Sequence, residues 1–236
     1  MNEHTPHELS RRAVLSLLGV GGVATVGSIY SKVSGSHRAS ARSRESLTEA
    51  TRDEWAQGVE TTRAAGAPVA TPRGSTIGFL YVPRLRDRVW GFPIVEGTDP
   101  KTLNVGIGHL TPTALPGRVG NVALFGHRTS SGKPFEDFDE LVAGDSAIIE
   151  TKDSWLSYEL VASATVLPDA MWVAQSNPLR NATLKTSLTT SAATSERVLS
   201  LITCTPKYST KFRLVWWATQ TARSDHANPP SAISTT

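Results

Sequence analysis

"RVLSLITCTP", residues 197–206, is the stretch from which the fold of this chain is best interpreted. Apolar residues dominate positions 198–202 and a turn-forming proline follows at 206, which is typical of a buried strand that ends at a turn. Cys204, the only cysteine among 236 residues, stands at the end of this strand. A lone cysteine can be inert core filler, an intermolecular bridge or a nucleophile, so the surrounding sequence has to distinguish these roles.

Six further short runs share this β-rich composition, with Gly, Pro, Asp and Asn between them. They lie at residues 76–83, 89–97, 121–127, 145–153, 155–167 and 212–220. Seven such runs, with little helical periodicity between them, predict an all-β barrel or sandwich. Residues 133–145 have apolar positions at helical spacing, so one or two helical turns are expected there. We interpret the acids of that segment as a solvated helix face, because no Gly-centred cation-binding spacing accompanies them.

Composition narrows the function classes. Apolar residues make up 39% and charged residues 19%, which fits one folded domain with extensions at its ends. The net charge is only +3 and the basic residues are scattered without an aromatic stripe, so nucleic acid is not an expected partner. A single cysteine excludes an intramolecular disulfide and a multi-thiolate metal site.

The N-terminus carries an export pattern. Two arginines at 11–12 precede eighteen uncharged residues, 13–30, which are barely enough to cross a bilayer and include four glycines. The S-R-R-x-x-L pattern resembles a twin-arginine export signal, with Val14 where Phe is usual. Residues 1–30 are therefore interpreted as an export signal or membrane anchor. Small residues at 39–41 offer a cleavage site, and basic residues after the apolar run argue against an N-in anchor, so retention and release both stay open.

Two segments flank the β-rich region. Residues 31–73 are rich in Ser, Arg, Ala and Thr and are interpreted as a linker or stalk with some helix. Residues 221–236 are expected to form a disordered tail. The predicted folded domain therefore covers residues 74–220.

Three polar side chains stand at strand ends in this domain. His127 follows an apolar strand and a glycine, where we expect a tight backbone turn, and Arg213 lies early in the strand after Cys204. Together they can perform acyl transfer, because a neighbouring cation favours the nucleophilic thiolate and histidine can shuttle a proton between amines. The fixed donors of arginine suit a developing oxyanion. Taken singly, each residue also fits a plain structural role: core cysteine, hydrogen-bonded histidine or solvated arginine.

The same stretches resemble the sortase family. The resemblance is carried by "GNVALFGHRTSSGKPF" (120–135), "LSLITCTP" (199–206) and "KFRLVWWA" (211–218). "PIVEGTDPKTLNVGIGHLTPTALPGRVGNVALFGHR" (93–128) is most similar to the class E type, with class D next. The resemblance covers residues 74–218. Two details depart from the pattern: Leu201-Ile202 replaces the usual Thr-Leu, and "GIGHL" replaces the more typical G-P-G-H-Y.

The resemblance implies a closed eight-stranded β-barrel behind an N-terminal hydrophobic helix and linker. By position, it makes Cys204 the nucleophile, His127 the general acid and base, and Arg213 the stabiliser of the oxyanion and the substrate. Thr203 matches a strand-end threonine and is expected to assist through its backbone or hydroxyl. His109 matches an upstream histidine of the subgroup and is interpreted as a structural or pocket residue.

The reaction implied is cleavage of an L-P-x-T-G or L-A-x-T-G sorting signal between Thr and Gly through a thioacyl-enzyme. A cell-wall amine or a pilin lysine would resolve it. The implied partners are surface proteins with a C-terminal sorting signal, a peptidoglycan precursor amine, and the membrane through the N-terminal segment. No cofactor or metal is needed, although some sortases use calcium. The expected location is the cell membrane with an extracellular catalytic domain. A housekeeping role is favoured over pilin polymerisation, because no C-terminal membrane helix and no obvious lid extension are visible.

Other thiol enzymes fit less well. An L,D-transpeptidase would place a histidine just before the cysteine in an S-H-G-C-type stretch, and "LITCTP" has none. Papain-like and NlpC-type peptidases place the cysteine before the histidine in the chain, which is the reverse of the order here. A non-catalytic secreted β-barrel that binds a peptide or glycan is the remaining alternative, and in it Cys204 would be buried and unreactive.

Overall fold

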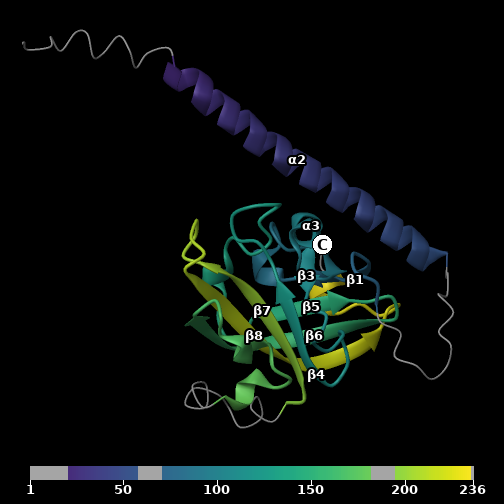
Figure 1. Cartoon of the computed structure of the whole chain (residues 1–236). Helices are drawn as coiled ribbons and strands as arrows, with labels where there is room; N and C mark the ends of the chain where they lie inside the picture. The colour runs from purple at the N-terminus through teal and green to yellow at the C-terminus, as the bar shows by residue number, and fades with distance from the viewer. Residues whose placement is uncertain (1–20, 58–70, 182–194, 235–236) are drawn as a thin grey trace, which may run out of the picture. The chain divides into compact units, whose positions relative to one another are not determined.

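Eight strands close into a barrel in the order β1-β2-β3-β4-β7-β8-β6-β5 (Figure 1). The computed structural model describes residues 21–57, 71–181 and 195–234. Neighbouring strands are antiparallel except the parallel pairs β2·β3 and β4·β7. The strands are β1 (Thr76–Tyr81), β2 (Phe92–Glu96), β3 (Ile107–His109), β4 (Gly120–Phe125), β5 (Ser146–Glu150), β6 (Ser154–Val166), β7 (Arg197–Thr205) and β8 (Phe212–Asp225). The predicted all-β closed barrel is confirmed.

Helical elements are few within the compact unit that begins at residue 40. They are α2 (Gly21–Ala56), which begins before that unit, α3 (Pro100–Val105), α5 (Ser231–Ser234) and the 3-10 turns η1 (Pro83–Leu85), η2 (Phe138–Glu140), η3 (Met171–Ala174) and η4 (Pro178–Arg180). Among the helices that the structure describes, none combines the length and apolar character needed to cross a membrane. Most of the expected export segment, residues 1–20, lies outside the described residues.

The barrel interior is filled by alternate side chains of all the long strands. Leu199 and Leu201 of β7 and Trp216 of β8 belong to this inner cluster. Their neighbours Val198 and Ile202 point to the other face of the sheet, where they join a second apolar cluster. Both faces of β7 are therefore buried, which explains why its sequence is a continuous apolar run rather than an alternating one.

Two further layers cover the outside of the barrel. Over β4, β6, β7 and β8, the connection between β6 and β7 contributes Val173 of η3 and Leu179 of η4. Over β1, β5 and β6, the end of α2 contributes Trp55, and the C-terminal segment contributes Ala232 and Ile233. The first of these layers lies on the face that carries the candidate site.

Several elements differ from the sequence-based expectations. Strand β3 was not among the seven runs, because three residues are too few for a periodicity to show. The tail expected to be disordered from residue 221 instead continues β8 to Asp225 and forms α5. Residues 31–56, expected as part of a linker or stalk with some helix, belong to the continuous helix α2. In contrast to these differences, the one or two helical turns expected over 133–145 are present as the single 3-10 turn η2.

Candidate active site

Cys204 and Arg213 are direct partners on neighbouring strands. They face each other in the antiparallel register of β7 and β8, one step beyond the pair Thr203–Leu214. Directly opposite residues project to the same face with Cβ atoms about 4.5–5.5 Å apart, so the Cys204 and Arg213 side chains leave the sheet next to each other. Cys204 is half-buried and its thiol is free, which distinguishes it from the fully buried residues before it in β7.

His127 reaches the same row from β4. The parallel register pairs Phe125 with Ile202, and continuing it by two residues places His127 beside Cys204. Hydrogen bonds maintain this register past the end of the strand: Gly126 N donates to the carbonyl of Ile202 at 3.1 Å, and Thr203 Oγ1 donates to the carbonyl of Gly126 at 2.8 Å. By this extended register, the three predicted residues fall in one row at the ends of β4, β7 and β8, with His127 two residues beyond the end of β4.

This row lies on the outer face of the barrel wall. It continues the rows of Phe125, Ile202 and Val215 and of Ala123, Ser200 and Trp217, which pack under the connection between β6 and β7. The three residues therefore lie at the strand ends, on the outer wall of the barrel, beside that covering connection.

The surroundings of His127 and Arg213 set their electrostatics. Burial lowers the pKa of His127 from its ordinary value of 6.5, because a charged imidazolium loses hydration there. Arg213 is half-buried, and its Nη1 donates to the carbonyls of Thr210 at 2.9 Å and Phe212 at 3.0 Å. These bonds orient one side of the guanidinium fork toward the turn that precedes β8.

Gly126 is required for space rather than for a tight turn. A tight backbone turn was expected before His127, and Gly126 does not adopt the positive φ for which such turns often use glycine. A Cβ at Gly126 would come within 2.6 Å of the Phe135 ring. Phe135 is fully buried and stacks on Phe138 with ring centroids 3.9 Å apart, so it has little room to move.

Thr203 and His109 occupy supporting positions. Thr203 is 2% exposed and faces away from Cys204, and its hydroxyl is used in the bond to Gly126 described above. His109 is 1% exposed, with Nδ1 2.7 Å from Glu96 Oε2 and Nε2 3.0 Å from the carbonyl of Ala114. Its two ring nitrogens are both engaged in the barrel wall. Of the two interpretations given for His109, the structural one fits these contacts.

Arg128 is a buried residue near the site that the sequence did not single out. It follows His127 directly, is 4% exposed, and its Nη1 donates to Thr205 Oγ1 at 3.0 Å. The sequence did contain an indication of this burial. Side chains alternate along a strand, so residue 128 faces inward when His127 faces outward, and a buried arginine needs an acidic partner. The acids of the 133–145 segment were the candidates for that partner.

Those acids are paired with basic side chains. Glu136 contacts Lys133 and Arg88, Asp137 contacts Arg88 and Lys207, and Asp139 contacts Arg128. Among the described residues, no group of three His, Cys, Asp or Glu is arranged to hold a metal ion. Glu136, Asp137 and Asp139 therefore serve in ion pairs, whereas Glu140 is exposed, as expected for a solvated face.

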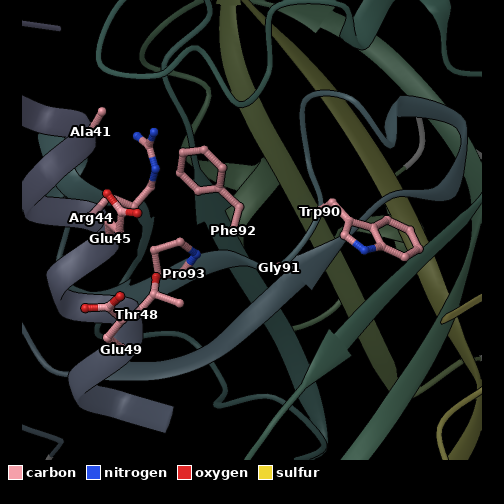
Figure 2. Close-up of a pocket in the computed structure, with 9 residues that line it drawn as sticks. All are labelled: Ala41, Arg44, Glu45, Thr48, Glu49, Trp90, Gly91, Phe92 and Pro93. Atoms are coloured by element: carbon pink, nitrogen blue, oxygen red, sulfur yellow. The ribbon is translucent and has the colours of Figure 1, made fainter. Parts of the chain in front are cut away.

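A separate pocket of about 300 Å³ lies between α2 and the segment leading into β2 (Figure 2). Arg44, Glu45 and Glu49 contribute from the helix, and Trp90 and Phe92 from the other side. The Arg44 guanidinium lies over the Phe92 ring, 4.8 Å from its centroid, while Trp90 points away from the helix. None of the predicted site residues lines this pocket.

Comparisons with known proteins agree on one family. Residues 80–221 match the family model of the sortase domain. The chain is 32% identical over 187 residues to sortase SrtE2 of Streptomyces coelicolor, covering 75% of this chain and 68% of that protein. The structure of sortase E from Streptomyces avermitilis aligns with a TM-score of 0.58 at 29% identity, covering 69% of this chain and 99% of that one. A structure of sortase E1 from Streptomyces coelicolor, with a tripeptide in its active site, aligns with a TM-score of 0.57 at 26% identity, covering 67% and 96%.

Proposed function

Because this chain belongs to the sortase family of cysteine transpeptidases, we propose that it cleaves an L-P-x-T-G or L-A-x-T-G sorting signal between Thr and Gly. The new Thr carboxyl end is then transferred to an amine. The observation that carries the proposal is the row of Cys204, His127 and Arg213 across three strand ends. The tripeptide in the active site of the similar sortase E1 supports a peptide substrate.

The first half of the reaction forms a thioacyl-enzyme. The Cys204 thiolate attacks the Thr carbonyl carbon, a carbon–sulfur bond forms, and the carbonyl oxygen takes the displaced electron pair. Arg213 is the cross-strand partner of Cys204, so its remaining donors are available to that oxyanion. His127 then gives its proton to the Gly nitrogen as the carbon–nitrogen bond breaks.

The second half transfers the acyl group to an amine. Neutral His127 accepts a proton from the incoming amine, whose nitrogen attacks the thioester, and the Cys204 thiolate leaves. Burial lowers the pKa of His127, so the neutral imidazole required here prevails at neutral pH. The first half uses the protonated form of His127, which donates to the leaving Gly nitrogen.

The biological setting follows from the same proposal. The substrates are surface proteins that end in a sorting signal, and the acceptor is an amine of a peptidoglycan precursor. The N-terminal export pattern supports action at the cell membrane, with the barrel on the extracellular side. A housekeeping role in anchoring surface proteins is the version we favour.

The proposal is tested with the full chain and two fluorogenic peptides, one with L-P-x-T-G and one with L-A-x-T-G. Each is incubated with and without an oligoglycine amine, and wild type is compared with Cys204→Ala. We expect cleavage, an amine-linked product in wild type, and a loss of at least about 10³-fold in the variant, because the nucleophile is gone. The faster peptide identifies the preferred signal.

The control is the reaction of the thiol itself. Well-folded wild type that leaves both peptides intact, with a Cys204 that also resists iodoacetamide, would contradict the proposal and leave the peptide-binding barrel as the explanation.

A further inference from the structure

Arg128 occupies the back of the candidate site. Side chains alternate along the extended end of β4, so Arg128 lies on the face opposite His127, where the continued register makes Thr205 its neighbour. The 3.0 Å bond from Arg128 Nη1 to Thr205 Oγ1 agrees with this placement. Arg128 thus stands behind the row that carries the thiol.

One guanidinium here joins three segments of the chain. Nη1 donates to Thr205 Oγ1 and, at 3.4 Å, to the carbonyl of Cys204 itself. Nη2 donates to Asp139 Oδ1 at 2.6 Å, and Nε donates to the carbonyl of Glu136 at 3.3 Å. The ends of β4 and β7 and the segment around η2 are held by the same side chain.

The chemistry of this contact requires an arginine. A buried charge costs free energy even when it is paired, and apolar side chains of the same volume stabilise a fold at least as well. The planar fork, in contrast, can donate in three directions at fixed angles, which a lysine ammonium cannot reproduce. Arg128 lowers the stability gained from burial, yet it bonds to the backbone carbonyl of Cys204. Its role is therefore to fix the position of that backbone rather than to fill space.

We propose that Arg128 is a positioning residue for Cys204, holding the end of β7 so that the thiol stays opposite His127 and beside Arg213. The expected effect of Arg128 on peptide turnover rests on the proposed transpeptidase function. Its effect on the thiol exists whether or not a sorting signal is the substrate. Arg128 itself faces away from the reacting atoms and does not contact the substrate.

The test uses Arg128→Lys in the full chain, which keeps the charge and removes the fork. The matched control is Arg88→Lys, since Arg88 is also paired with the segment around η2, through Glu136 and Asp137, and neither of these ion pairs involves β7. Two experiments are made. One measures the rate of Cys204 alkylation by iodoacetamide from pH 5 to 10, and the other measures kcat per titrated thiol and KM for the better peptide.

We expect Arg128→Lys to lower kcat about 10- to 100-fold with little change in KM, as misplaced reacting groups do. Alkylation near neutral pH should slow several-fold, because the thiol is no longer held opposite His127 and beside Arg213. Arg88→Lys should change neither quantity. A purely structural Arg128 would reduce the number of active molecules, while kcat per titrated thiol and the alkylation profile stayed at wild type, and that result overturns the proposal.

Thr205→Val provides a second route if Arg128→Lys fails to fold. This variant removes one acceptor of the fork and keeps the side-chain shape, so a smaller change in the same direction is expected, and an unchanged alkylation profile would count against the inference. A wild-type chain that cleaves neither peptide contradicts the proposed function alone. The alkylation comparison still decides the role of Arg128.

Discussion

At the scale of single residues, the site depends on close approach between neighbours. Gly126 allows the Phe135 ring to pack against the backbone immediately before His127. The hydroxyl of Thr203 then bonds to the carbonyl of that same glycine. His127 is therefore held from both sides by packing and hydrogen bonding, rather than by a special backbone conformation.

Replacing Gly126 with alanine tests this explanation. The new methyl group must displace Phe135 or the backbone that carries His127, so we expect Gly126→Ala to lower the free energy of unfolding by about 1–3 kcal/mol. Peptide cleavage should fall at least about tenfold, because His127 moves relative to Cys204. Chemical denaturation and peptide turnover measure the two effects.

The companion variant is Gly126→Ala with Phe135→Leu, in which the smaller side chain makes room for the methyl group. Partial recovery of turnover in the double variant supports the steric explanation. No recovery would mean that the glycine serves another purpose.

The three side chains proposed to react were the part of the candidate site that could be predicted from sequence. Cys204, His127 and Arg213 stand at ends of recognisable strands, so their order and position were sufficient to propose them. Arg128 was missed because its role depends on Thr205, which is 77 positions away in the chain. Strand periodicity gives the face of a residue but not its distant partner.

At the scale of elements, one carbonyl fixes the connection between β6 and β7 to the barrel. The Val173 carbonyl of η3 accepts from Asn121 Nδ2 at 3.2 Å, Ser200 Oγ at 3.1 Å and Trp217 Nε1 at 3.4 Å. Asn121 Nδ2 also donates to the carbonyl of Gln175, and its Oδ1 accepts from Ser200. Three neighbouring strands therefore hold η3, in the described part of the connection that covers the face next to Cys204, His127 and Arg213.

Removing Asn121 should loosen this connection. Asn121→Ala removes the buried amide that bonds to Ser200 and to the carbonyls of Val173 and Gln175, which costs about 1–3 kcal/mol of folding free energy. We expect a several-fold higher KM for the peptide with a smaller change in kcat. The variant alters the covering connection beside Cys204, His127 and Arg213 and leaves those three residues in place. Asn228→Ala, at an exposed position, is the control. An Asn121→Ala variant with unchanged KM would separate this connection from substrate binding.

The strands were predictable as elements, but their limits were less so. Runs such as 155–167 and 197–204 agree with β6 and β7 within one residue at each end. Strand β8 continues to Asp225, through polar residues with no alternating apolar pattern, because the neighbouring β6 supplies hydrogen-bond partners there. Tertiary pairing, which local sequence does not encode, extends the element.

At the scale of the whole molecule, the end of α2 and the C-terminal segment converge on one buried carboxylate. Glu150 is 2% exposed and accepts from Arg52 Nη2 at 3.0 Å, Tyr81 Oη at 2.5 Å and His226 Nε2 at 3.0 Å. Trp55 packs edge-on against Phe79 beside it. Burial alone would raise the pKa of Glu150, but hydrogen bonds from Arg52, Tyr81 and His226 outweigh it and lower that pKa below 4.5.

A shortened chain should reveal this contribution. A chain starting at residue 71 loses Arg52 and Trp55, whereas one starting at residue 40 keeps them, so we expect the shorter chain to be less stable at pH 7 by about 2 kcal/mol. The stability that comes from the lowered pKa of Glu150 is present above pH 4.5 and is lost as pH falls through its folded value.

The difference in the free energy of unfolding between the two chains should therefore become smaller on acidification. Thermal unfolding at pH 7 and at about pH 3 measures this difference. Equal stability at pH 7 would contradict a structural role for the end of α2.

The barrel as a whole was predictable in class, while its outer layers were not. Seven apolar runs indicated closed or packed sheets, and the interior follows from them. Trp55 and the C-terminal segment contribute to the outer layer through contacts with Phe79 and Glu150. The local sequence of α2 and of the C-terminal segment does not show these contacts. Polar, weakly periodic stretches were therefore interpreted as linker and tail.

Closure of the barrel also limits how a peptide can be recognised. All eight described strands have a hydrogen-bonded neighbour on each side, so the sheet offers no free edge to which an extended peptide could add as a further strand. Selectivity for a peptide must then come from pockets and loop side chains rather than from a backbone ladder. A site that recognises its peptide in this way can accept a proline in the ligand. Strand addition would disfavour that proline, because it has no backbone N–H to donate.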